Sequence, residues 1–184
     1  MKLLLHVCCG PCATWAIKSL MEEYSVTCYF YNPCIEPFDE YEKRKDAFVK
    51  VCEELGVDYV IGDYDNDSFR ELVKGLEDEP ENGKRCLKCY EQRLKKAASY
   101  GEDNGFDMFT TTLTISPHKR SDVIFRIGNE VIKNKKIKFL EKDFKKKDGF
   151  NQSVSMSKEM GLYRQGYCGC EFSKSSCPKS RSQP

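Results

Sequence analysis

Five cysteines stand in two tight groups along the sequence. Cys8, Cys9 and Cys12 lie within five residues, and Cys86 and Cys89 form a Cys-x-x-Cys pair. A thiolate at a turn into a helix gains from the helix N-terminus, and two intervening residues let a thiolate pair reach one metal site. Together Cys8, Cys9, Cys86 and Cys89 supply the thiolates for either a zinc ion or an iron–sulfur cluster. Adjacent cysteines are awkward around one ion and easier on a cluster, where each binds a different iron, so the pattern favours the cluster.

Cys168 and Cys170 form a third group, separated only by Gly169. A disulfide across one residue is strained, because bridged α-carbons must lie within a narrow range of distances. Strained disulfides are labile and often redox-active, and Gly169 would relieve part of the strain. The pair is therefore a candidate redox-active pair, and the alternative is a second pair of metal ligands.

Alternating apolar runs and amphipathic stretches predict the elements that position these cysteines. Strands are expected over residues 2–7, 26–31, 57–61 and 106–113. Helices are expected over residues 12–23, 38–55, 67–76, from the Cys-x-x-Cys pair to about 100, and over 120–133. This alternation predicts a parallel sheet flanked by helices, in one α/β domain spanning residues 1–184. An irregular or helical C-terminal appendage is expected from about residue 148.

In such a sheet, ligands bind beyond the C-terminal ends of the strands. Cys8 and Cys9 directly follow the first expected strand, and Thr110, Thr111 and Thr112 lie at the end of the fourth. We therefore expect these two distant segments to meet in one pocket.

Composition limits which cellular compartment and which partners are expected. The 184 residues carry a net charge of +1 and include 11 cysteines. The apolar start is too short for a signal peptide, and no run approaches the ~20 apolar residues of a membrane helix. We expect a cytoplasmic protein without membrane contact, in which clustered cysteines indicate metal binding or redox chemistry. Cys28 and Cys52, in apolar surroundings, are expected to be small buried residues.

Other polar residues give weaker signals. His6 is expected to be a satisfied core histidine, and His118 a solvated loop residue. The basic run over 133–147 is expected to be a solvated face, and its interleaved aromatic residues, with Arg164 nearby, leave a phosphate-binding surface as the alternative. Four acids at strand and loop ends could supply an oxygen ligand but more often cap helices or face water: Asp63, Asp65, Asp67 and Asp107.

Motifs in order along nearly the whole chain resemble one known family. They are residues 6–12 (HVCCGPC), 31–33 (YNP) with Glu40, Tyr41 and Arg44, 85–89 (RCLKC), 109–113 (FTTTL) with Ser116 and Pro117, 143–146 (DFKK), 157–159 (SKE), 162–165 (LYRQ) and 167–170 (YCGC). On these motifs the chain resembles the QueH-type epoxyqueuosine reductases. It departs from the family pattern at Cys34, where a polar residue is expected, and over residues 81–84.

The resemblance implies a Rossmann-like fold of the nucleotide α-hydrolase type and the reduction of epoxyqueuosine to queuosine at the wobble base of tRNA. This is the last step of queuosine biosynthesis, here without cobalamin. It further implies a 4Fe-4S cluster on Cys8, Cys9, Cys86 and Cys89, a redox-active Cys168–Cys170 disulfide, and an external electron donor. An additional mononuclear iron, with Cys12 or an aspartate as ligand, is a further expectation. The rival functions are a zinc-stabilised RNA-binding module and a thiol–disulfide oxidoreductase.

Overall fold

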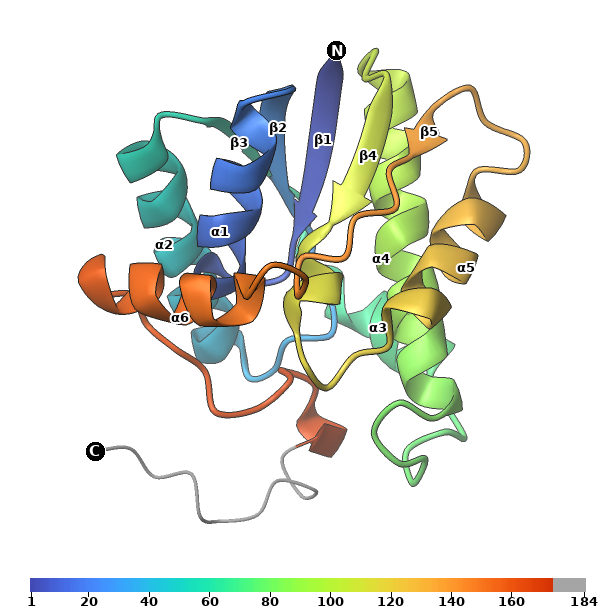
Figure 1. Ribbon diagram of the computed structural model, residues 1–184. Coiled ribbons are helices and arrows are strands. Elements are labelled where there is room, and N and C mark those ends of the chain that lie inside the picture. The colour runs from blue at the N-terminus through green and yellow to red at the C-terminus, as the bar shows by residue number, and fades with distance from the viewer. Residues whose placement is uncertain (174–184) are drawn as a thin grey trace.

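The computed structural model describes residues 1–173 and contains a parallel sheet of five strands in the order β3-β2-β1-β4-β5 (Figure 1). The strands are β1 (Lys2–Val7), β2 (Ser25–Phe30), β3 (Asp58–Ile61), β4 (Met108–Thr111) and β5 (Lys138–Phe139). All neighbouring pairs are parallel, so the C-terminal ends of the strands meet at one edge.

Helices cover both faces of this sheet. They are α1 (Gly10–Met21), α2 (Phe38–Leu55), α3 (Asn66–Leu72), α4 (Lys84–Asp103), α5 (Ser121–Val131) and α6 (Gly149–Glu159), with short 3₁₀ turns η1 (Thr112–Ile115) and η2 (Glu171–Ser173). Figure 1 shows α1, α2 and α6 on one face and α4 and α5 on the other.

Strand β1 buries side chains on both faces of the sheet, so a layer of helices is needed on each face. Leu3, Leu5 and Val7 pack into the core beneath α1 and α2, whereas Leu4 packs into the core beneath α4. All four side chains are fully buried. A strand that buries both faces has no polar alternation, which is why the first residues form a continuous apolar run.

The structure confirms the expected class, a Rossmann-like parallel sheet flanked by helices. The expected fourth strand ends early, at Thr111, because Thr111 Oγ1 accepts a hydrogen bond from Leu113 N and the chain turns into η1. Strand β5 was not expected, since its two residues lie inside the basic run. Beyond residue 148 the chain first forms α6, which packs against α1, and then continues without regular structure to η2. Within residues 1–173, no helix has the length and apolar character to cross a membrane.

Gly10 sets the position of α1 against α2. A Cβ atom at Gly10 would lie 2.6 Å from the carbonyl oxygen of Ala47, closer than real contacts allow. The first turn of α1 can therefore approach α2 only with glycine here, and this approach fixes the place of the cysteines on either side.

Candidate metal centre and pocket

The turns after β1 and β4 meet at the C-terminal edge of the sheet. Thr112 Oγ1 accepts a 3.1 Å hydrogen bond from the backbone nitrogen of Cys8, and it lies 3.4 Å from Cys8 Sγ. The two segments that the sequence analysis expected to converge are thus in direct contact.

Three thiols cluster at this turn. Sγ atoms of Cys8, Cys9 and Cys12 all lie within 4.8 Å of one another, and those of Cys8 and Cys9 are 3.9 Å apart. Cys9 is the N-cap of α1, so the thiols lie at the positive end of a helix dipole. Hydrogen bonds from Cys12 and Cys9 lower the pKa of Cys8, so Cys8 loses its proton more readily than the other two thiols of the group. Gln165, from the C-terminal segment, contacts this group of thiols: its Nε2 lies 3.0 Å from Cys9 Sγ.

Cys86 and Cys89 lie in the first turns of α4, and both are buried. Cys86 Sγ accepts a 3.3 Å hydrogen bond from the backbone nitrogen of Asn82, in the loop that precedes the helix. The thiol of Cys89 is hydrogen-bonded to that of Cys34, and this bond lowers the pKa of Cys34 to about 6. The residue that departs from the family pattern therefore lies directly beside an expected ligand.

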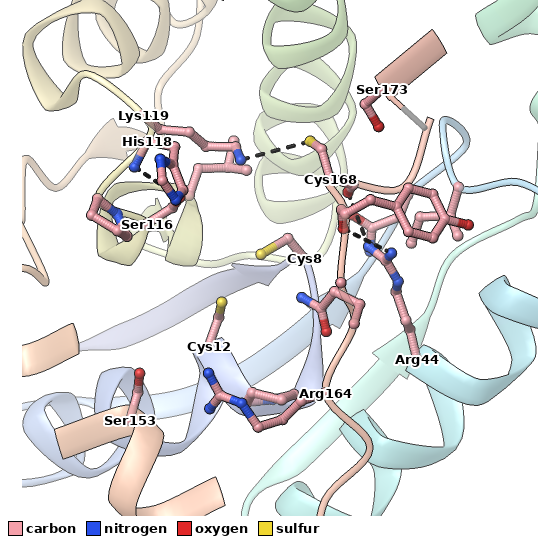
Figure 2. Close-up of a pocket in the computed structure, with 18 of the residues that line it drawn as sticks. Cys8, Cys12, Arg44, Ser116, His118, Lys119, Ser153, Arg164, Cys168 and Ser173 are labelled. Atoms are coloured by element: carbon pink, nitrogen blue, oxygen red, sulfur yellow. Dashed lines mark hydrogen bonds between the residues drawn. The ribbon is translucent and has the colours of Figure 1, made fainter. Parts of the chain in front are cut away.

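A pocket of about 380 Å³ opens beside the thiols of Cys8 and Cys12, and Cys86 and Cys89 are not among the residues that line it. Figure 2 shows the sulfurs of Cys8 and Cys12 on one side of it and Cys168 on another, with Lys119, Arg44 and Arg164 around them. Among the described residues that line it, Glu81 is the one carboxylate, against four lysine or arginine side chains. The pocket therefore suits a ligand with negative charge or strong hydrogen-bond acceptors.

The C-terminal segment carries Cys168 to the pocket wall, while Cys170 is buried behind it. Both are free thiols in this structure. Lys119 Nζ lies 3.7 Å from Cys168 Sγ (Figure 2). Burial disfavours the charge of Lys119, but Cys168, Tyr90 and Cys8 outweigh that effect and raise its pKa above the usual range. Lys119 is consequently a protonated group held at the pocket.

Gly169 lets the chain pass closely between two neighbours. Its φ is +122°, and a Cβ atom there would lie 2.8 Å from Arg44 Nη1. An L-residue would be strained in this conformation and would displace the arginine. Gly169 thus serves the path of the chain, whether or not it also relieves a disulfide.

The remaining candidates occupy structural or peripheral positions. His6 is fully buried, Nδ1 lies 2.8 Å from Thr111 Oγ1, and Nε2 lies 3.1 Å from the Tyr31 carbonyl, so it is a satisfied core histidine as expected. His118 is exposed on the pocket rim.

The four candidate acids, Asp63, Asp65, Asp67 and Asp107, are exposed and do not line the pocket. Asp65 caps α3, and Asp107 accepts a hydrogen bond from Lys2 N at the opposite end of the sheet. Cys28 and Cys52 are fully buried in the core, as expected.

The structure divides the basic run of residues 133–147. Its first part surrounds β5, whose start pairs with the start of β4, far from the pocket edge. Lys142 Nζ binds the Ser19 carbonyl, and Lys145 Nζ binds the carbonyls of Thr114 and Lys119. These two lysines bind carbonyls of the protein itself, so the expectation of a solvated face is wrong for them.

Sequence reasoning missed Lys119 and Arg93 and gave Arg44 no role. Arg93 follows Cys89 by one helical turn and is fully buried beside the thiols, where a polar residue on an amphipathic helix would ordinarily face water. Its spacing from Cys89 was an available signal, since residues four apart share a helix face. Lys119 gave no comparable signal, because its loop has no periodicity.

The chemistry of the donors fits a soft metal or an iron–sulfur cluster. The convergent groups are thiols, which select zinc, copper(I) or iron–sulfur clusters over hard cations. Two buried polar atoms beside them, Arg93 Nη2 and Gln165 Oε1, have no hydrogen-bond partner in the described residues. An additional group within the site would give at least the arginine an acceptor.

Fold and site together define an α/β protein with a cysteine-rich centre at the C-terminal edge of a Rossmann-like sheet. A family model described as epoxyqueuosine reductase QueH matches residues 3–176, and the chain belongs to this family.

Curated relatives agree with this assignment. The epoxyqueuosine reductase QueH of Streptococcus pyogenes is 41% identical over 177 residues, covering 93% of this chain and 69% of that protein. The QueH of Thermotoga maritima is 36% identical over 174 residues, covering 93% of this chain and 89% of that protein.

Among solved structures, the fold is similar to that of the U34-tRNA thiolase NcsA from Methanococcus maripaludis, solved with its [4Fe-4S] cluster. The TM-score is 0.54 and the identity 19%, and the alignment covers 89% of this chain. This chain spans 58% of the length of the thiolase chain, and the likeness concerns the fold.

Proposed function

We propose that this protein reduces epoxyqueuosine to queuosine in tRNA, with Cys8, Cys9, Cys86 and Cys89 as ligands of a 4Fe-4S cluster. The observation that carries the proposal is the group of three thiols at the β1–α1 turn beside one cationic pocket, in a chain of the QueH family; Cys86 and Cys89, in the first turns of α4, lie outside that group and are proposed as the remaining ligands. Action on tRNA would place the protein in the cytoplasm.

The proposed reaction removes one oxygen atom. An epoxide, two electrons and two protons give an alkene and water, so the reaction needs an external electron donor. When bound, the cluster would supply electrons one at a time.

The side chains of this protein serve the charge-stabilising and binding steps. Lys119 Nζ stays protonated at the pocket wall, because its ammonium form is stabilised there, and it can donate a hydrogen bond to the departing oxygen and stabilise the negative charge that develops on it. Arg164 Nη1 binds Ser157 Oγ at 2.6 Å, which holds the guanidinium at the pocket where it can meet an acceptor of the substrate.

Cys168 and Cys170 complete the proposal as a redox-active pair. Their dithiol form can release two electrons and two protons as it becomes a disulfide, which matches the electron and proton demand of the reaction. The position of Cys168 on the pocket wall and of Cys170 two residues on supports this role.

Cys12 is available for a second metal, proposed as a mononuclear iron. Its thiol lies within the 4.8 Å group of Cys8 and Cys9 and lines the pocket. The four candidate aspartates do not line the pocket, so Cys12 is the better supported ligand.

Metal analysis and turnover on one anaerobic preparation test the function. We expect iron and acid-labile sulfide near four per chain, a brown protein, and conversion of epoxyqueuosine in tRNA when dithionite supplies electrons. Nucleosides from digested tRNA would be quantified by mass spectrometry. Zinc without iron or turnover would favour a zinc-stabilised RNA-binding module, and disulfide exchange without bound metal would favour a thiol–disulfide oxidoreductase.

A further inference from the structure

Arg93 is a buried arginine whose hydrogen bonds are incomplete. It is 3% exposed; Nε lies 3.3 Å from the Cys89 carbonyl, and Nη1 lies 3.4 Å from Asn32 Oδ1. Nη2 is buried and has no hydrogen-bond partner among residues 1–173. Leaving a buried donor of a charged group without a hydrogen bond is energetically unfavourable, so an acceptor is expected at this position.

Besides Asn32 and the Tyr90 ring, the groups around Arg93 include thiols. No carboxylate in the described part of the chain lies within ion-pair distance of its guanidinium. Burial opposes its charge, yet Cys89, Cys34, Cys168 and Cys8 outweigh burial and raise the pKa of Arg93 above the usual range. Those thiols come from four separate regions of the chain, and two of them, Cys8 and Cys89, are proposed cluster ligands. Negative charge on the neighbouring sulfurs would compensate this cation.

Asn32 ties this cation to the cysteine turn. Its Nδ2 donates a 2.9 Å hydrogen bond to the carbonyl of Val7, the residue before Cys8, while its Oδ1 faces Arg93 Nη1. Arg93 is thus held between the start of α4 and the end of β1, the two segments that carry the proposed ligands.

We propose that Arg93 is a positioning residue that sets the reduction potential of the cluster, an inference that rests on the proposed function. One-electron reduction adds a negative charge to the cluster, and a buried cation beside the ligand thiolates stabilises the reduced form more than the oxidised form. A hydrogen bond from Arg93 Nη2 to a ligand sulfur would act in the same direction, since net charge, hydrogen bonds to sulfur and solvent exposure set such potentials.

The competing role is substrate binding, because Arg93 also lines the pocket. An arginine that held an acceptor of the substrate would change the KM for tRNA and leave the potential of the substrate-free protein unaltered. An arginine that tunes the cluster changes the potential with no substrate present.

The experiment is a redox titration of Arg93→Met, Arg93→Gln and Arg93→Lys. The protein is loaded with cluster anaerobically, contains no tRNA, and its reduction is monitored by electron paramagnetic resonance. We expect wild-type iron and sulfide content and a more negative midpoint potential in the methionine and glutamine variants. Arg93→Lys keeps the charge but loses the forked donors, so its potential should lie between theirs and that of the wild type.

Lys96→Met is the matched control. Lys96 lies on the same helix, is exposed, and its Nζ lies 5.7 Å from the ring centroid of Tyr31. Removal of this solvent-screened charge should leave the potential unchanged, which separates a specific effect of Arg93 from a general effect of charge.

Three results would overturn the inference. The first is a wild-type midpoint potential in cluster-loaded variants. If these variants also had a raised KM for tRNA, Arg93 would be a substrate-binding residue. Failure of all three variants to hold iron would make Arg93 a requirement for assembly. A wild-type protein without a 4Fe-4S cluster would overturn the proposed function as well, so the two failures are distinguishable.

Discussion

Arg44 Nη1 donates a 2.9 Å hydrogen bond to the carbonyl of Cys168. The same guanidinium donates through Nη2 to the Tyr167 carbonyl at 3.1 Å and through Nε to Glu40 Oε1 at 2.8 Å. Tyr163 OH donates to the other oxygen of Glu40. This buried ion pair on α2 fastens the segment that presents Cys168, although its partners lie more than 120 residues away in the sequence.

Replacing Arg44 should loosen that segment and destabilise the fold. Arg44→Met leaves Glu40 buried without its cation, and such a loss typically costs about 3–5 kcal/mol. We expect a lower free energy of unfolding of reduced, metal-free protein in urea, and faster alkylation of Cys168 as followed by mass spectrometry.

Lys45→Met is the control for this change, because the Lys45–Glu42 pair is partly exposed and should contribute about 0–1 kcal/mol. Arg44→Met protein that unfolds and alkylates like the wild type would show that the C-terminal segment is held by other contacts.

The sequence was sufficient for four of the five strands, all but β5, and for the meeting of Cys8 with Thr112. Periodicity gives the type of each element, and parallel strands bring their C-terminal ends to one edge, so both conclusions follow from local patterns. Arg93 and Lys119 could not be placed in this way. Their roles depend on which side chain reaches across from another element, and a lysine in a loop or an arginine on a helix has the same local pattern whether it faces water or thiols.

The basic run shows the same limit for surface residues. Lys142 and Lys145 donate to protein carbonyls, whereas Lys146 and Lys147 are exposed. The loop that carries them lies against the pocket rim, since Lys145 Nζ binds the carbonyl of Lys119. The sequence alone does not distinguish these neighbouring lysines.

We therefore expect Lys146 and Lys147 to contribute to tRNA binding. Replacing both by Gln should weaken the affinity for tRNA and reduce the slope of log affinity against log salt by about 0.7 for each lost single-strand phosphate contact. Filter binding at several salt concentrations measures both quantities.

The control for this change is the double replacement of Lys133 and Lys136 by Gln, at the opposite end of the sheet. An equal loss of affinity in both double variants would indicate diffuse charge attraction rather than a binding surface at the pocket.

The ligand assignment predicts a clear division among the cysteines. Serine at Cys8, Cys9, Cys86 or Cys89 should remove most bound iron and sulfide and lower the thermal stability, because a cluster on these ligands would join β1–α1 to α4. Elemental analysis and the sulfur-to-iron absorbance band report the loss.

Alanine at Cys28 or Cys52 provides the control, since both are buried in the core away from the pocket. Cys34→Ala tests the assignment more sharply, because Cys34 contacts Cys89 without being a proposed ligand. If Cys89→Ser protein kept its full iron content and Cys34→Ala protein lost its iron, the cluster ligand would be Cys34 rather than Cys89.

The last prediction separates redox chemistry from structure at Cys168 and Cys170. Serine at either position should leave the iron–sulfur spectrum intact, because neither is a proposed ligand, and should remove most epoxide reduction, because the dithiol can no longer form its disulfide. Iron content and turnover of epoxyqueuosine tRNA must be measured on the same preparations. Ser173→Ala is a suitable control: its hydroxyl donates a 2.7 Å bond to the Cys170 carbonyl, so its removal perturbs this segment without removing a thiol. Loss of iron in proportion to activity would make the pair metal ligands, and retention of both would make it inert. Only loss of turnover with iron retained, and with Ser173→Ala still active, agrees with a pair that cycles between dithiol and disulfide.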